Sequence, residues 1–283
     1  MSHVKLAELQ KEAQRGGYAV PHFLGGNMEM VVAEIKAAED KNSPLAMGFA
    51  PEVFYMVPME LSLPLMVAAA KGARVPVATQ LEHGRDFDTI VKAIKLGVSS
   101  VMFDGSSLPY EENIRQTREI VKFAHAYGVS VEAELGSVGG SALVNVEIKE
   151  SLLTEPQIVP DFIEKTGVDS LAISFGNFHG KYRGIPILDF DRVKEIASLV
   201  DTPLVMHGGS GLTENDYKHC IECGISNIHF YTYVTLGMWE HLKHAVGNIE
   251  AKPVYHQFVD WTIDYFYKQT VNVINMLGSE NKA

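Results

Sequence analysis

The feature that most constrains the fold of this chain is a regular alternation of short apolar runs with longer helical patterns. Eight runs rich in β-branched residues are predicted to be strands, and they cover residues 18–23, 44–50, 75–81, 99–104, 129–135, 170–175, 203–207 and 227–230. Helical patterns lie between them, for example over residues 28–41, 86–96, 112–127, 190–199 and 214–223. Nearly continuous apolar strands that alternate with helices indicate a parallel sheet covered by helices. Eight such units in 283 residues predict an α/β fold, a closed (β/α)8 TIM barrel.

The same pattern predicts a single domain over residues 1–283. An open, doubly wound sheet is the competing fold, but the GxGxxG turn that follows the first strand of such a sheet is missing. No linker rich in Pro, Gly or Ser divides the chain. Residues 1–16 are predicted to form a helix that caps the bottom of the barrel. Residues 233–283 are predicted to form a helical tail, whose apolar face packs within the chain or against a second copy in a homodimer or higher oligomer.

Charge and composition exclude several classes of partner. The formal net charge of -11 argues against nucleic acid, because a phosphate backbone is bound by clustered lysines and arginines. No apolar run approaches the roughly 20 residues that a membrane helix needs. The chain has only 2 cysteines, which gives no sign of a disulfide framework. We therefore expect a cytoplasmic protein that acts on a small molecule.

Three histidines stand where predicted strands end. His83, His179 and His207 each precede a glycine at or just after an apolar strand. The carboxyl ends of barrel strands open at one mouth, so these side chains are expected to converge there. Neutral imidazoles are good zinc ligands, and three protein ligands leave a fourth position open for a substrate. The sequence therefore predicts a catalytic site with one Zn²⁺ per chain.

A glycine-rich turn follows the seventh predicted strand. The run His207-Gly-Gly-Ser-Gly leads into a helix that is expected to begin near Thr213. Glycines let backbone N–H groups approach a phosphate, and the amino end of a helix adds a favourable dipole. Arg183, on the neighbouring strand-end segment, offers a fork of charged donors. Together these features indicate a phosphate site.

Six segments carry a resemblance to a known family, and they stand in that family's order and at its spacing. They are Tyr18-Ala-Val-Pro, Leu81-Glu-His-Gly, Ser100-Val-Met-Phe-Asp-Gly-Ser, Glu132-Ala-Glu-Leu-Gly, Gly176-Asn-Phe-His-Gly and Met206-His-Gly-Gly-Ser-Gly-Leu. Over nearly its whole length the chain resembles the class II, zinc-dependent fructose- and tagatose-bisphosphate aldolases. The resemblance implies a lyase that cleaves a ketose phosphate to dihydroxyacetone phosphate and an aldehyde.

The resemblance also implies roles for individual residues. It places Zn²⁺ on the three histidines, and a monovalent cation, Na⁺ or K⁺, near the phosphate of the dihydroxyacetone phosphate half. The residues that it implies for holding this phosphate are Gly180, Arg183, Gly208, Ser210 and Thr232.

The chemistry explains why such groups are needed. Breaking a C–C bond beside a carbonyl leaves negative charge, which a bound Zn²⁺ neutralises as a Lewis acid. A carboxylate takes the C4 hydroxyl proton, and Glu82 stands where the family has an aspartate for this step. Asp104 and Glu134, at two strand ends, are candidates for orienting the zinc histidines, with a purely structural role as the alternative for each.

Two departures from the family pattern concern proton transfer. Glu82 is one methylene longer than aspartate, which moves its oxygens by about 1 Å, and a displacement of this size can change a rate about 100-fold. The loop after Gly140, where the family carries a second acid/base, has no acidic residue before Glu147. The second proton-transfer group is therefore Glu147, Glu150, another group, or absent.

Other departures concern the far end of the substrate. Leu24 and Ala50 replace polar family residues, His229 replaces an asparagine, and no arginine follows Asp201. These changes favour a ketose 1-phosphate whose aldehyde product ends in a group other than phosphate, for example sulfolactaldehyde from sulfofructose 1-phosphate. His229 is then expected to help bind that end of the substrate, with His22 and Tyr231 beside it. The alternatives are an ordinary fructose- or tagatose-1,6-bisphosphate aldolase and a metal-binding relative without activity.

Overall fold

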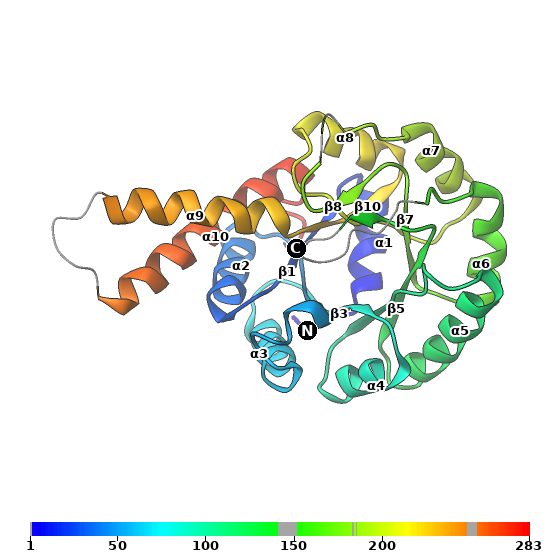
Figure 1. Cartoon of the computed structure of the whole chain (residues 1–283), viewed down its shortest axis with the longest axis horizontal. Helices are drawn as coiled ribbons and strands as arrows, with labels where there is room; N and C mark the ends of the chain where they lie inside the picture. Colours follow the sequence, from blue (N-terminus) through cyan, green and yellow to red (C-terminus); the bar gives the residue numbers. More distant parts are fainter. Residues whose placement is uncertain (1, 141–151, 183, 185, 248–253) are drawn as a thin grey trace.

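Eight parallel strands close into a barrel in the computed structural model, which describes residues 2–140, 152–182, 184, 186–247 and 254–283. The strands are β1 (Val20–Leu24), β2 (Leu45–Phe49), β3 (Val77–Gly84), β4 (Ser100–Phe103), β5 (Ser130–Leu135), β7 (Ser170–Ile173), β9 (Leu204–Met206) and β10 (Ile225–Phe230). They follow one another around the ring as β1-β10-β9-β7-β5-β4-β3-β2. This architecture confirms the predicted TIM barrel (Figure 1).

Helices pack around the strands of the barrel. They are α1 (Leu6–Gly16), α2 (Met28–Asp40), α3 (Met59–Gly72), α4 (Phe87–Lys95), α5 (Tyr110–Ala126), α6 (Val159–Thr166), α7 (Phe190–Leu199), α8 (Glu214–Cys223), α9 (Thr232–Gly247) and α10 (Tyr255–Leu277), with short 3-10 turns at Pro51–Val53 and Pro156–Ile158. Asp86 begins α4, because its side chain accepts a hydrogen bond from Thr89 N at 2.8 Å. Among the described residues, no helix is long and apolar enough to cross a membrane.

The strand ends differ from the predicted ones in ways that concern the mouth of the barrel. β3 continues to Gly84, so that Glu82 and His83 belong to the strand itself. β10 begins at Ile225, two residues before the predicted residue 227, because Ile225 pairs with Leu204 of β9. A second, two-stranded parallel sheet, which was not predicted, pairs β6 (Gly139–Gly140) with β8 (Phe178–His179). It holds the segment after β5 against the segment that carries His179.

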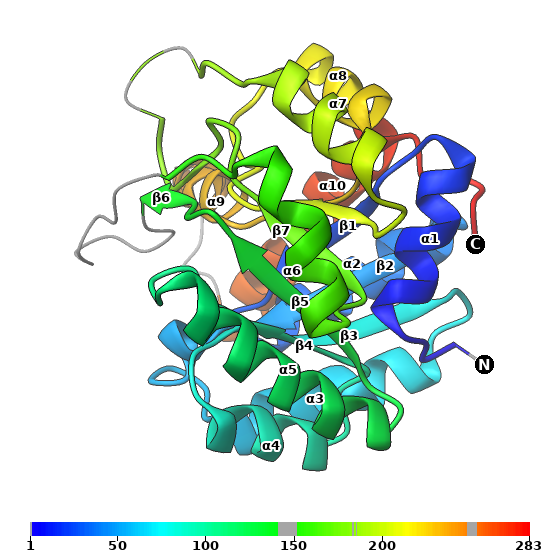
Figure 2. The same cartoon turned by 90° about the vertical axis from the view of Figure 1, so that its right-hand side faces the viewer.

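The two ends of the chain pack on different parts of the barrel. α1 lies across the amino-terminal ends of the strands, where Leu6 and Leu9 are buried against Val20 and Ala78. It thus lies at the end of the barrel opposite β6 (Figure 2). α9 and α10 form a helical hairpin that projects from the side of the barrel (Figure 1).

The tail that was predicted to be helical is this hairpin, and its inner part packs within the chain. Phe266 is buried in the main core, and Ile263 and Tyr267 pack against that core. The Tyr267 hydroxyl donates a hydrogen bond to Asp40 at the end of α2, at 3.1 Å. The predicted intramolecular contact of the tail is therefore confirmed for this part of α10.

Candidate active site

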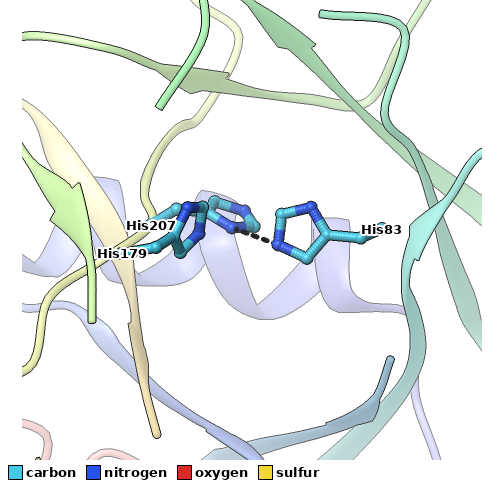
Figure 3. Close-up of side chains that lie close together, drawn as sticks. All are labelled: His83, His179 and His207. Carbon is cyan, nitrogen blue, oxygen red and sulfur yellow. Dashed lines mark hydrogen bonds between the residues drawn. The ribbon is translucent and has the colours of Figure 1, made fainter. Parts of the chain in front are cut away.

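His83, His179 and His207 come together at the carboxyl ends of the strands. One ring nitrogen of each lies within 4.8 Å of a ring nitrogen of the other two (Figure 3). His207 Nδ1 and His83 Nε2 are 3.2 Å apart. Tetrahedral Zn²⁺ with Zn–N bonds of about 2.0–2.1 Å places its ligand nitrogens about 3.3 Å from one another. The separation therefore fits two ligands of one such ion, with His179 as the third.

The backbone at His83 is distorted in a way that aims this side chain. His83 has φ of 43°, which is rare for a residue other than glycine. The pairing of β3 with β4 shifts register between Leu81 and Gly84. A bulge at this position redirects a side chain that would otherwise follow the strand's alternation. Residues in such conformations persist where the surrounding structure enforces them and cluster at functional sites, and the His83 imidazole here faces His207.

Carboxylates lie behind two of the three histidines. Glu132 Oε1 accepts a hydrogen bond from His207 Nε2 at 2.8 Å, which leaves His207 Nδ1 as the nitrogen that faces His83. Asp104 Oδ2 lies 3.5 Å from His83 Nδ1. Carboxylates in these positions fix the tautomer and the orientation of metal-binding imidazoles. Asp104 also anchors the next loop, because its Oδ1 accepts a hydrogen bond from Ser106 N at 3.2 Å. It therefore contacts a predicted metal ligand and also has a structural contact.

Glu132 was not singled out from the sequence. Its partner His207 lies 75 positions further along the chain, and only closure of the barrel brings the two together. The available signal was strand alternation, since Glu132 and Glu134 are acidic residues two apart on an otherwise apolar strand. Glu134, which was singled out, accepts a hydrogen bond from Val138 N at 2.9 Å and groups with His83 and Asp104.

The contacts between histidines and carboxylates shift the pKa values of the groups at the mouth of the barrel. Burial lowers the pKa of His83, but the hydrogen bond and charge of Asp104, with the charge of Glu134, outweigh it and raise the pKa to about 9. Burial and the positive charge of the other two histidines hold the pKa of His179 well below its usual value. Burial and the charge of Asp104 raise the pKa of Glu134 to about 7. Protons and a divalent cation thus compete for the same centre.

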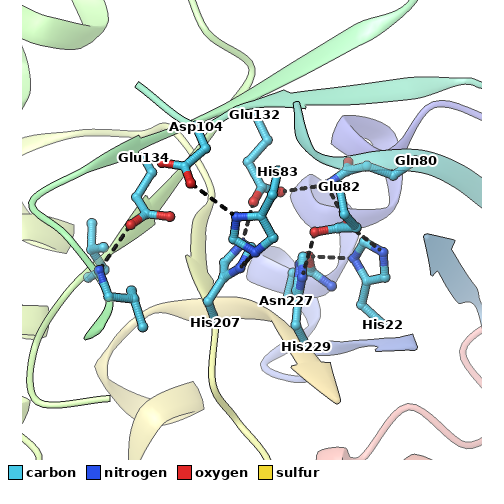
Figure 4. Close-up of polar contacts among 12 residues, drawn as sticks. His22, Gln80, Glu82, His83, Asp104, Glu132, Glu134, His207, Asn227 and His229 are labelled. Carbon is cyan, nitrogen blue, oxygen red and sulfur yellow. Dashed lines mark hydrogen bonds and ion pairs between the residues drawn. The ribbon is translucent and has the colours of Figure 1, made fainter. Parts of the chain in front are cut away.

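Glu82 precedes His83 on β3 and is fully buried. Its carboxylate is 3.0 Å from His22 Nε2 and 3.3 Å from His229 Nδ1 (Figure 4). Gln80 Nε2 donates a hydrogen bond to Glu82 Oε1 at 2.8 Å and another to Glu132 at 3.3 Å. Although burial alone raises the pKa of Glu82, the charges of His229 and His22 hold it well below its usual range. His22 and His229 are therefore directed at Glu82 in this structure.

The glycine-rich turn lies between β9 and α8, beside the amino end of α9. Gly208 has φ of 65°, and a Cβ there would lie 2.4 Å from the Phe178 carbonyl oxygen, so the position requires glycine. The Tyr182 hydroxyl, which follows Gly180 along the chain, donates a hydrogen bond to the Gly208 carbonyl at 3.0 Å. Ser210 Oγ accepts one from Tyr231 N at 3.1 Å.

These contacts bring together four of the five residues expected to hold a phosphate. Gly180, Gly208, Ser210 and Thr232 lie on adjoining segments at the ends of β8, β9 and β10, and Thr232 is the first residue of α9. α8 begins as expected at Thr213, with a capping box formed by Asp216. Arg183, the fifth, lies outside the described residues, and so do Glu147 and Glu150.

The fold and the convergence of three histidines, with carboxylates behind them, define a barrel enzyme whose centre suits a divalent metal. Residues 4–282 match the family described as fructose-bisphosphate aldolase class-II. The chain belongs to this family, and it is accordingly an aldolase-type lyase.

Solved structures support the same assignment. The YdjI aldolase from Escherichia coli K12 is 32% identical and superposes with a TM-score of 0.87, with 99% of each chain covered. A protein assigned as a fructose-1,6-bisphosphate aldolase from Coccidioides immitis is 28% identical with a TM-score of 0.89, covering 98% of this chain and 97% of its own. The fructose-bisphosphate aldolase from Campylobacter jejuni has a TM-score of 0.82, covering 100% of this chain and 97% of its own; at 21% identity it shows the fold alone.

Proposed function

We propose that this protein is a zinc-dependent class II aldolase that reversibly cleaves a ketose 1-phosphate to dihydroxyacetone phosphate and an aldehyde with a non-phosphate end group. The observation that carries the proposal is the convergence of His83, His179 and His207 within 4.8 Å at the mouth of an aldolase-family barrel. The family uses a divalent metal. The choice of Zn²⁺ rests on the all-imidazole ligand set and on the 3.2 Å separation of two ligand nitrogens.

When bound, the ion supplies Lewis-acid stabilisation of the negative charge that develops beside the carbonyl. Asp104 and Glu132 hold the His83 and His207 rings so that Nε2 of the former and Nδ1 of the latter face inward. Their own negative charge strengthens the imidazoles as ligands.

Glu82 is proposed to accept the C4 hydroxyl proton as the C–C bond breaks. Its low pKa keeps it ionised, so at neutral pH it is ready to accept a proton rather than to donate one. The hydrogen bond from Gln80 at 2.8 Å fixes one carboxylate oxygen, which sets the direction of the other. The extra methylene of glutamate is thus held in one place instead of adding freedom at the reacting atom.

The phosphate of the dihydroxyacetone phosphate half is proposed to bind among Gly180, Gly208, Ser210 and Thr232, with Arg183 as the charged donor. Backbone N–H groups in glycine-rich turns and at the amino end of α9 suit a dianion. A monovalent cation, Na⁺ or K⁺, beside this phosphate is part of the proposal. Binding the phosphate here positions the ketose carbonyl toward the three histidines.

The far end of the substrate is proposed to carry something other than phosphate. Leu24 and Ala50 stand at the ends of the neighbouring strands β1 and β2, where polar side chains would be needed to hold a second phosphate. An unpaired phosphate dianion would incur a desolvation penalty of several kcal/mol. A sulfonate, with a single charge, needs fewer donors. We retain His229 as a candidate for binding this end of the substrate, which would require it to give up part of its contact with Glu82.

A panel of aldehydes tests this function. The zinc-loaded protein is assayed for condensation of dihydroxyacetone phosphate with glyceraldehyde 3-phosphate, sulfolactaldehyde and neutral aldehydes. We expect the phosphorylated aldehyde to be a poor partner. A kcat/KM for fructose or tagatose 1,6-bisphosphate within about tenfold of the best substrate would favour the ordinary bisphosphate aldolase instead. Absence of condensation with every aldehyde would favour the inactive relative.

A further inference from the structure

A second group of potential ligands lies beside the three histidines. His22 of β1, Glu82 of β3 and His229 of β10 each offer an atom within 4.8 Å of the other two. All three residues are buried, His22 and Glu82 completely. No ligand residue is shared with the three-histidine centre, although the rings of His207 and His229 are in contact, with centroids 4.0 Å apart and planes tilted by 34° (Figure 4).

Asn227 determines which nitrogen of each histidine faces Glu82. Its Nδ2 donates a hydrogen bond to the Val20 carbonyl at 2.9 Å, so its Oδ1 is the atom turned toward the two histidines. His22 Nδ1 lies 3.4 Å from this oxygen and His229 Nε2 lies 3.0 Å from it. Since an amide oxygen only accepts, both rings carry their proton on the Asn227 side. In the neutral rings, His22 Nε2 and His229 Nδ1 are then lone pairs that point toward a carboxylate.

The three atoms converge without hydrogen-bonding one another. His22 Nε2, Glu82 Oε2 and His229 Nδ1 are buried, and none of them has a hydrogen-bond partner among the described residues, although the two histidine–carboxylate distances are only 3.0 and 3.3 Å. Lone pairs this close repel one another unless a proton or a metal cation lies between them. The two histidine–carboxylate distances, one to each oxygen of Glu82, are close to the spacing of about 3.3 Å between ligands of one tetrahedral ion.

The three-histidine centre has a similar arrangement behind its rings. There too, a carboxylate behind each of two rings fixes the proton on the far nitrogen, and the inward nitrogens of His83 and His207 face each other at 3.2 Å. Behind His22 and His229, Asn227 plays the part that Asp104 and Glu132 play there.

Two features of the surroundings concern this cluster: a glycine that leaves room beside it, and the identity of the groups that pair with the Glu82 carboxylate. A Cβ on Gly48 of β2 would lie 2.6 Å from Glu82 Cγ and 3.0 Å from His22 Nε2, so glycine is needed beside the cluster. Among the described residues, the ion-pair partners of Glu82 are His22 and His229. A buried carboxylate needs a matching positive charge, and a divalent cation held by two neutral imidazoles provides it.

We infer that His22 Nε2, His229 Nδ1 and the Glu82 carboxylate form a second, buried site for a divalent transition metal, with zinc as the ion best suited to two imidazoles and a carboxylate. The inference goes beyond the proposed aldolase reaction and does not depend on it. Glu82 would then be common to both centres, as a ligand of the second ion and, next to His83 in the sequence, as the proton acceptor proposed for the first.

Metal content tests the site without reference to activity. The full chain is unfolded and refolded with excess Zn²⁺, because a buried site fills most readily during folding. Free metal is then removed, and zinc is counted by mass spectrometry. We expect about two ions per chain in the wild type and about one in His229→Asn and in His22→Gln. His219→Gln, on the exposed face of α8, is the matched control and should keep both ions.

Position and independence are tested in the same proteins. In crystals of the loaded wild type, anomalous scattering at the zinc edge should show a second peak about 2.0–2.2 Å from His22 Nε2 and His229 Nδ1. The His179→Ala protein should lose the ion of the three-histidine centre and keep the ion of the second site. Gly48→Ala, which retains all the ligands, should lower the occupancy of the second site. One zinc per chain in the wild type, with no second peak, would overturn the inference. Two bound ions without aldol activity would leave it standing and count against the proposed function alone.

Discussion

At the scale of single residues, the geometry of the site depends on the hydrogen-bond and ion-pair partner of each reactive side chain. His83 and His207 were predicted as metal ligands because each precedes a glycine at a strand end. Glu132 could not be identified in this way, because its role depends on a hydrogen bond to His207, 75 residues away. The contact of Glu82 with His22 and His229 was hidden for the same reason. Sequence patterns mark reactive residues, whereas the partners that tune them come from closure of the barrel.

Glu82→Gln removes the proposed proton acceptor while keeping the shape and the hydrogen bond from Gln80. We expect kcat to fall at least about 100-fold, because an amide does not take the C4 hydroxyl proton. Steady-state rates of cleavage measure this, with zinc at the three-histidine centre checked in parallel. Glu82→Asp is the companion variant, and a gain in rate would show that the longer side chain is tolerated rather than matched. Near-normal turnover of Glu82→Gln would remove Glu82 from the mechanism.

The raised pKa of His83 predicts how zinc binding depends on pH. With a pKa of about 9 in the metal-free protein, His83 holds a proton at neutral pH that Zn²⁺ has to displace. The affinity for zinc should therefore rise about tenfold per pH unit from about pH 6.5, and level off near the pKa of His83.

Competition with a chelator measures this affinity. The His229→Asn variant is used, so that only the three-histidine centre binds zinc. Asp104→Asn removes the carboxylate that raises the pKa of His83, so the rise should end at a lower pH. An affinity that does not change between pH 6.5 and 8.5 would contradict the assignment of His83 as a ligand.

At the scale of elements, the strands and most helices followed from apolar periodicity, but the small sheet of β6 and β8 did not. Its strands are only two residues each, and Gly139-Gly140 carries no side chains from which to recognise a pattern. Yet this sheet positions His179, the third predicted zinc ligand. The strands that form the barrel could be predicted, whereas the short segments that finish the mouth depend on contacts between loops.

The glycine-rich turn gives a prediction about an element. Gly208→Ala places a Cβ against the Phe178 carbonyl at a position with φ of 65°, so backbone strain of about 1–3 kcal/mol is expected. The turn should shift, raising KM for the sugar phosphate and lowering the midpoint of thermal unfolding. Gly72→Ala, where no heavy atom lies within 4 Å of the new Cβ, is the matched control. If both variants bind substrate like the wild type, the turn does not hold the phosphate.

At the scale of the whole molecule, the α9–α10 hairpin is an addition to the barrel and projects from its side (Figure 1). Its inner end packs on α2 and the core, while Trp239 and Tyr255, further out, are 64% and 79% exposed. Aromatic side chains are enriched at interfaces between proteins. We therefore retain the prediction of a homodimer or higher oligomer. Light scattering should give a multiple of 31.2 kDa, and the mass of a single chain at micromolar concentration would contradict it.

The central claim, that three histidines hold a zinc ion on which aldol cleavage depends, is tested most directly by removing and restoring that ion. Release of dihydroxyacetone phosphate from the best ketose phosphate is followed before chelation, after it, and after one equivalent of Zn²⁺ per site is returned. We predict that cleavage stops on chelation while the circular dichroism of the barrel is kept, and that zinc restores it in the wild type but not in His179→Ala. Cleavage that continues in the chelated protein, or full zinc-restored activity in His179→Ala, would contradict the account.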